Sequence, residues 1–168
     1  MLVSKNDCEI LRKLGQKVAE IAALPVQKKT KDKWKALNSL KPERPMVMID
    51  QIPWHEMNVN DELTLKTEDE FCRNIERNLR RIIYSWEHMP GDMVVEPYVE
   101  IPMKIHGADL RLGLEPEEKR KVSDPQNNVV GHHYMDQLKT ESDLKKIKKP
   151  DIKLDKEKTD LAREKAEE

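Results

Sequence analysis

A short apolar run, residues 46–49 (MVMI), constrains the fold more than any other stretch of the chain. Pro42 and Pro45 precede it, and two prolines so close together exclude a helix and hold the chain extended. Four consecutive apolar residues between turn signals are typical of a strand that is buried on both faces, as in a parallel sheet. A second such run, residues 93–95, follows a long amphipathic segment. The order strand, helix, strand predicts an α/β fold with two neighbouring parallel strands.

Two helices are predicted before the first strand. Asn6 and Glu9 have the spacing of a capping box, and apolar residues then recur on one helical stripe. Pro25 ends that helix and suits the first turn of a second one, which runs to about Leu40. Residues 1–41 are therefore predicted to form an N-terminal helical extension.

A crossover helix is predicted between the two apolar runs. Thr67 and Glu70 have the spacing of a capping box, and apolar residues follow three or four apart as far as Trp86. This helix is long enough to join two parallel strands by a right-handed connection. Thr140 is expected to cap a short helix. The last predicted helix, residues 155–168, has no capping signal at its end, so we expect the chain to stop within an element.

Beyond the second run the apolar period changes to two. Residues 99–106 and 110–114 alternate between apolar and other side chains, which predicts extended or hairpin segments. Residues 116–128 are expected to be a polar loop, and residues 129–134 to return as a short strand or bend.

Length and composition narrow the class of protein. The 168 residues fall short of the roughly 250 that a closed eight-stranded α/β barrel usually takes. The net charge of −1 gives no electrostatic reason to expect nucleic acid or an anionic membrane as a partner. No stretch approaches the roughly 18 apolar residues of a membrane span, and the N-terminus does not have the pattern of a signal peptide, so a cytoplasmic location is expected. Cys8 and Cys72 are far apart in predicted helices, which favours two reduced thiols over a disulfide or a zinc site.

Polar side chains follow both apolar runs. Asp50 and His55 follow the first run, whereas Glu96 and Tyr98 end the second. Neighbouring parallel strands lie about 4.8 Å apart, so their carboxyl ends can place these four groups at one pocket mouth. Such a set suits proton transfer or the orientation of a polar substrate, and we take the four as candidate catalytic residues. The structural alternative is that Asp50 and Glu96 satisfy loop amides while His55 packs under Trp54.

Trp54, His132 and His133 are candidate substrate-binding residues. Adjacent residues of a strand point to opposite faces, so the histidine doublet cannot chelate one metal ion from an extended segment, although one imidazole can face a site. Glu56, which also follows the first run, is a weaker candidate for a catalytic role. A metal trio of His106 with the doublet lacks tight ligand spacing, so the sequence predicts no metal ligand.

Several of these stretches resemble one known family. Residues 41–50 (KPERPMVMID), followed by a capped helix and then residues 91–98 (GDMVVEPY), are similar to the opening of the uroporphyrinogen decarboxylase-like superfamily. That superfamily includes uroporphyrinogen decarboxylase and the cobalamin-dependent (corrinoid) methyltransferases, which move methyl groups to thiols. Residues 52–57 (IPWHEM) and 132–138 (HHYMDQL) resemble further features, so the similarity runs over nearly the whole chain.

The resemblance implies a TIM (β/α)8 barrel with its site at the carboxyl ends of the strands. Residues 42–168 would then be only the opening part of the barrel, the rest of which would lie beyond Glu168. In the methyltransferase branch, a zinc ion that activates the acceptor thiol is held by His and Cys ligands from the later half, so zinc and a corrinoid are expected only in a full-length relative. Residues 50–54 stand where true decarboxylases carry an Arg-rich motif, which favours the methyltransferase type over a tetrapyrrole decarboxylase.

Two functions therefore remain open. The chain is expected to be the N-terminal section of such an enzyme, inactive alone, whose full-length relative acts on a small-molecule substrate or a corrinoid protein. The alternative is a small α/β binding or assembly module that completes its sheet by oligomerising or by docking on a partner. Two strands with open edges would favour self-association in either case.

Overall fold

The computed structural model describes residues 3–107, 114, 116–122 and 130–167. The chain divides into two compact units, Met1–Glu100 and Ile101–Glu167. The first unit holds the predicted helical extension, both apolar runs and the crossover helix, whereas every strand of the described residues lies in the second.

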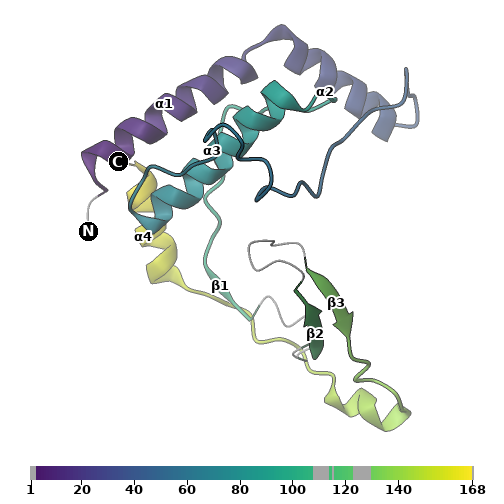
Figure 1. Ribbon diagram of the computed structural model, residues 1–168. Helices are drawn as coiled ribbons and strands as arrows, with labels where there is room; N and C mark the ends of the chain where they lie inside the picture. The colour runs from purple at the N-terminus through teal and green to yellow at the C-terminus, as the bar shows by residue number, and fades with distance from the viewer. Residues whose placement is uncertain (1–2, 108–113, 115, 123–129, 168) are drawn as a thin grey trace. The chain divides into compact units, whose positions relative to one another are not determined.

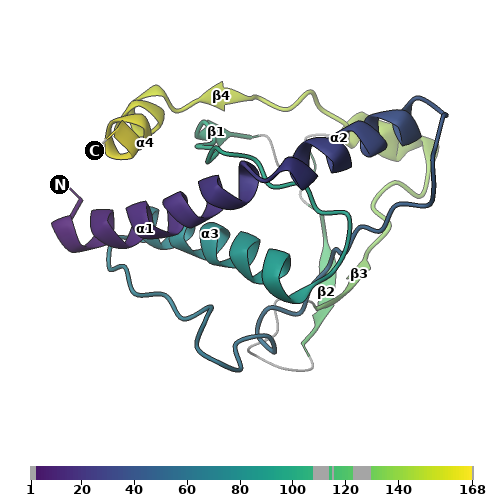
Figure 2. The same cartoon turned by 90° about the horizontal axis from the view of Figure 1, so that it is seen from above.

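Three helices build the first unit. They are α1 (Lys5–Ala22), α2 (Pro25–Asn38) and α3 (Glu70–His88). Helices α1 and α3 lie side by side in both views (Figures 1 and 2). The core of the unit is the cluster that their facing stripes bury together with one residue of the second apolar run, namely Val18, Ile21, Leu79, Ile83 and Val95.

The predicted helices are present, but their caps are different. The break between α1 and α2 falls at Pro25, as predicted. The N-cap of α1 is Ser4, whose hydroxyl accepts a hydrogen bond from the Asp7 N–H (3.1 Å), so the prediction of Asn6 is wrong. The N-cap of α3 is Asp69 instead of Thr67.

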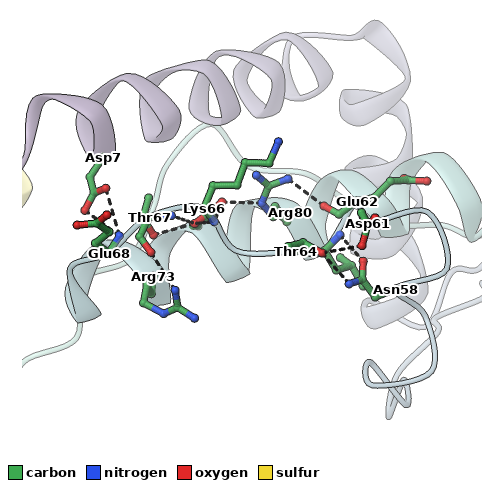
Figure 3. A network of polar contacts seen from close by, with 12 residues as sticks. Asp7, Asn58, Asp61, Glu62, Thr64, Lys66, Thr67, Glu68, Arg73 and Arg80 are labelled. Atoms are coloured by element: carbon green, nitrogen blue, oxygen red, sulfur yellow. Dashed lines mark hydrogen bonds and ion pairs between the residues drawn. The ribbon is translucent and has the colours of Figure 1, made fainter.

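A buried carboxylate on α1 holds the start of α3. Asp7 is almost fully buried and accepts hydrogen bonds from the N–H groups of Glu68 (3.2 Å) and Asp69 (3.0 Å), as Figure 3 shows for Glu68. Backbone N–H groups just before a helix need acceptors, and here a distant residue supplies them. This contact fixes where the two helices begin relative to each other.

Neither apolar run is a strand in the structure, so the described residues do not form the predicted pair of parallel strands. One backbone hydrogen bond lies near them: the N–H of Asp92, the residue before the second run, donates to the carbonyl of Val47 in the first run (2.9 Å). A strand buried on both faces needs neighbours on each side. Here Met48 is 74% exposed, so the run has no such cover.

The second unit contains four short strands in two antiparallel pairs. Strand β1 (Ile105–His106) pairs with β4 (Lys153–Leu154), and β2 (Glu118–Lys121) pairs with β3 (Gly131–Tyr134). Figure 1 shows β2 and β3 as adjacent arrows. The short 3₁₀ helix η1 (Glu141–Lys146) and the helix α4 (Lys156–Glu167) complete the unit.

The outcome for the second unit is mixed. The strand predicted within residues 129–134 and the helix capped by Thr140 are confirmed. Strand β2 lies within the predicted polar loop 116–128, so that prediction is wrong for residues 118–121. Of the alternating segment 110–114, only Leu114 lies within the described residues.

Helices and strands are both present, as an α/β class requires, but the sheets are small and antiparallel. Within the described residues no barrel closes and no sheet has more than two strands. No helix in the described part of the chain is long and apolar enough to cross a membrane.

Candidate functional site

The first unit has an apolar pocket of about 560 Å³ beside the first apolar run. Residues Val47, Met48 and Ile49 form one part of its wall. The rest comes from α2, from the end of α3 and from the second run, with Trp34, Met89, Gly91, Met93 and Val94 among the lining residues. The two runs that the sequence singled out therefore do share a site, although they do not pair as strands.

Two charged side chains neutralise each other at this pocket. Lys31 of α2 places its Nζ atom 2.7 Å from Oε2 of Glu96, and both side chains are about one-third exposed. Nearby, the indole N–H of Trp34 donates to the carbonyl of Asp92 (2.7 Å). Helix α2 is thus joined to the second run by this ion pair, by the Trp34 hydrogen bond and by a hydrogen bond from the N–H of Val95 to Oε1 of Gln27 (2.9 Å).

Asp92 organises the junction of the two runs. Its carboxylate accepts two hydrogen bonds from the guanidinium of Arg44 and one from the N–H of Val47 (2.8 Å). The Arg44 hydrogen bonds, helped by the Val47 N–H, lower the pKa of Asp92 to about 2. The same contact raises the pKa of Arg44. The sequence did not single out Asp92 as a functional residue, although Arg44 and Asp92 each stand just before an apolar run.

Only one of the four candidate catalytic residues lines this pocket. Glu96 does, whereas Asp50 is exposed and its Oδ1 atom accepts a hydrogen bond from the N–H of Gln51 (2.7 Å). Tyr98 is 58% exposed and lines a second pocket of about 440 Å³, together with Glu96. The contact of Asp50 with a loop amide matches the structural alternative considered for it.

Trp54 and His55 lie in the turn after the first run. The indole of Trp54 packs edge-on against Tyr84 of α3 (6.1 Å between ring centroids), and the guanidinium of Arg81 lies 4.9 Å from it. The imidazole of His55 is mostly buried, with Nε2 3.3 Å from Oε1 of Glu56. Trp54 therefore anchors the turn on α3, and neither Trp54 nor His55 lines the apolar pocket.

The histidine doublet belongs to the second unit. His132 on β3 pairs through Nδ1 with Glu118 (2.7 Å) and stacks on Tyr134 (5.8 Å). His132, with Arg120, holds the pKa of Glu118 below its usual range. His133 is exposed and lies opposite Lys119 in the register of the β2–β3 pair.

His106, the third member of the metal trio weighed in the sequence, is paired with Asp155 at 3.0 Å. The N–H of Lys158 and the imidazole of His106 lower the pKa of Asp155 to about 2. This contact accompanies the β1–β4 pair, where His106 lies opposite Lys153.

The apolar pocket is suited to receive apolar side chains or an apolar group, because half of its lining residues are Val, Ile or Met and because Lys31 and Glu96 are paired with each other. Three potential metal ligands come together elsewhere in this unit: Glu62, from the loop that precedes α3, and Glu87 and His88, from the C-terminal end of that helix. Comparison of the chain with protein-family models, with curated proteins and with solved structures gives no match.

Proposed function

We propose that the chain is the N-terminal section of a uroporphyrinogen decarboxylase-like enzyme, of the corrinoid-dependent methyltransferase type. In this role α1 and α2 precede the barrel, and the two apolar runs become its first two strands when further polypeptide covers them. The His and Cys ligands that the resemblance implies for a thiol-activating zinc come from the later half of such enzymes. We therefore expect the 168-residue chain to be inactive by itself.

The exposed first run is the observation that carries this proposal. Val47, Met48 and Ile49 are each about half exposed or more, although they form the most apolar stretch before α3. Among the described residues, the backbone hydrogen bonds of this run are those between Val47 and Asp92. Unpaired backbone next to exposed apolar side chains favours the addition of a neighbouring strand.

A buried amide beside the second run supports the same conclusion. Gln27 of α2 is 2% exposed, and its Oε1 atom accepts a hydrogen bond from the N–H of Val95 (2.9 Å). Its Nε2 atom is buried and has no acceptor among the described residues. Buried donors in complete folds are almost always paired. A carbonyl brought to this amide when the unit rearranges around added polypeptide would satisfy the donor.

The proposal is tested by reading the coding DNA downstream of codon 168 and expressing the chain with any polypeptide that continues the frame. We expect further strand–helix repeats with a later His and Cys set, and methyl transfer from methylcobalamin to a thiol by the longer protein but not by the 168-residue chain. A frame without such repeats, or a longer protein with no methyl transfer, would contradict the proposal.

A matched pair of substitutions separates the role of the first run from general effects on solubility. In the longer protein, Met48→Lys is expected to abolish folding, because a charge would enter a strand buried on both faces. Val59→Lys introduces the same charge at a loop residue that is also strongly exposed, and we expect it to be tolerated. Equal tolerance of both variants would show that the first run stays uncovered.

The alternative function is an assembly module, and the same exposed run favours it. In that case the 168-residue chain itself would form a stable oligomer of fixed size at low concentration. Met48→Lys would then return the chain to a monomer in sedimentation experiments, whereas Val59→Lys would leave the oligomer intact. A monomeric wild-type chain would exclude an assembly made of copies of this chain.

A further inference from the structure

We propose that Glu62, Glu87 and His88 form a binding site for a divalent transition-metal ion of the zinc class. One ligand atom from each residue lies within 4.8 Å of the others. Nε2 of His88 and Oε2 of Glu62 are 2.8 Å apart. These residues do not line the apolar pocket, so the site does not depend on the proposed function.

The C-terminal end of α3 and the loop before this helix bring the three side chains together. Glu87 and His88 are the last two residues of α3, and Glu62 comes from the loop that leads into this helix. The backbone carbonyls at a helix C-terminus form the negative end of its dipole, which favours a cation. The partial negative charge of the helix end therefore attracts a cation, as the two carboxylates do.

The backbone of Glu62 is held in place before any ion binds. Its carbonyl accepts a hydrogen bond from Nη1 of Arg80 (2.9 Å), and the next N–H, that of Leu63, donates to Oδ1 of Asn58 (2.9 Å). Figure 3 shows Glu62 beside Asp61, Thr64 and Asn58, with Arg80 reaching it from α3. A ligand on a fixed backbone loses less conformational freedom when it binds.

The kind of ion follows from the ligand set. An imidazole with carboxylates suits Zn²⁺, Co²⁺, Ni²⁺ or Cu²⁺, whereas Ca²⁺ prefers six to eight oxygen ligands. Three protein ligands leave a position for water or another small ligand, as in open zinc sites. The ring of His88 also rests against that of Tyr84 (4.4 Å between centroids), which restricts how the imidazole can turn.

A cation already occupies part of this cluster. The ammonium group of Lys17 on α1 lies 2.6 Å from Oε1 of Glu87, and both side chains are partly exposed. An exposed ion pair of this kind is weak, so a divalent ion can displace the ammonium and take the carboxylate. Lys17 is thus a competitor for the site, and its removal is expected to strengthen metal binding.

The experiment is calorimetric titration of the 168-residue chain with Zn²⁺, together with visible absorption spectra of the Co²⁺ complex. Loss of an outer-shell partner alone weakens metal binding by about 10- to 100-fold in known sites, so His88→Gln and Glu62→Gln are expected to weaken it by at least about 10-fold. Lys17→Met is expected to tighten it by about two- to fivefold, the worth of an exposed ion pair.

His133→Gln is the matched control, because it removes an exposed imidazole from the other unit. It is expected to leave the affinity and the Co²⁺ spectrum unchanged. The proposal is overturned if His88→Gln keeps the wild-type affinity while its circular dichroism shows an intact fold, or if His133→Gln is the variant that loses the ion. Absence of Zn²⁺ binding by the wild-type chain and by Lys17→Met would overturn it as well.

Discussion

At the scale of single residues, Asp92 shows how one carboxylate can join segments that are far apart in the sequence. It accepts hydrogen bonds from Arg44 and from the N–H of Val47, and its own backbone N–H donates to the Val47 carbonyl. An aspartate in an unfolded chain has a pKa of about 3.9, whereas these contacts lower the pKa of Asp92 to about 2 in the folded protein.

This lowered pKa gives a prediction with a definite sign. Because the folded pKa lies below the unfolded one, the stabilisation is fully present above about pH 4 and is lost as the pH falls towards 2. Asp92→Asn is therefore expected to have a lower urea midpoint than wild type near neutral pH, and the difference should shrink between pH 4 and pH 2. Urea unfolding at a series of pH values measures it.

Asp32→Asn is the control for that series, since Asp32 is exposed on α2. Its midpoint should match that of the wild type throughout. A gap between Asp92→Asn and wild type that is as large at pH 2.5 as at pH 6 would mean that Asp92 stabilises the fold without its charge.

Only some residues of the candidate site could be predicted from the sequence. The sequence indicated the two apolar runs and Glu96, because an apolar stretch followed by polar residues can be recognised from the order of residues alone. It offered a loop amide as one of two roles for Asp50 without choosing between them, and it could not indicate that Trp54 would lie on α3. Such contacts depend on which turn follows the run, and on backbone such as that of Gln51, which has a positive φ of 54°.

At the scale of elements, the helices were predictable, whereas among the strands β3 was predicted and β2 was not. A helix carries its pattern and its hydrogen bonds within one segment, so α1, α2 and α3 could be located from their periodic apolar stripes. A strand depends on partners elsewhere. Strand β2 (EKRK) has no apolar alternation at all, and its pairing with β3 determines it.

Glu76 explains why Thr67 was mistaken for the cap of α3. Thr67 is buried, and both its N–H (2.9 Å) and its hydroxyl (2.7 Å) donate to the carboxylate of Glu76. The same carboxylate, which is 0% exposed, accepts from the N–H of Lys66 (2.9 Å) and from Nε of Arg80 (2.7 Å). The threonine thus binds the second turn of the helix and leaves the capping role to Asp69.

We expect Glu76→Gln to destabilise the first unit by about 3 kcal/mol, because the carboxylate accepts several hydrogen bonds and pairs with a nearly buried guanidinium. Burial disfavours the charge, but the hydrogen bonds from Thr67, Lys66 and Arg80 outweigh it, so the pKa of Glu76 stays below its usual range. Chemical denaturation measures the change. Glu9→Gln, at an exposed position of α1, should change stability by less than about 0.5 kcal/mol, and an equal effect of both would exclude this account.

At the scale of the whole molecule, the two units have very different interiors. The first has a continuous apolar core made by α1, α3 and Val95. In the described part of the second unit, Ala162 is the buried hydrophobic residue, and every residue of β3 is exposed. Pairs of short strands are marginal in water without an apolar face to cover. The described structure thus places almost all of the hydrophobic stabilisation in residues 1–100.

This distribution leads to an expectation for the separated parts. Residues 1–100 expressed alone should keep their helices and melt cooperatively, because their core is complete within that span, whereas residues 101–168 alone should show no cooperative transition. Far-ultraviolet circular dichroism during heating measures both. Leu79→Ala, which removes a core side chain, should destabilise the full chain and the 1–100 fragment by the same amount, about 2–5 kcal/mol. Cooperative melting of residues 101–168 would show that the second unit folds by itself, and loss of the transition in residues 1–100 would show that the first unit depends on the second; either result would contradict the expectation.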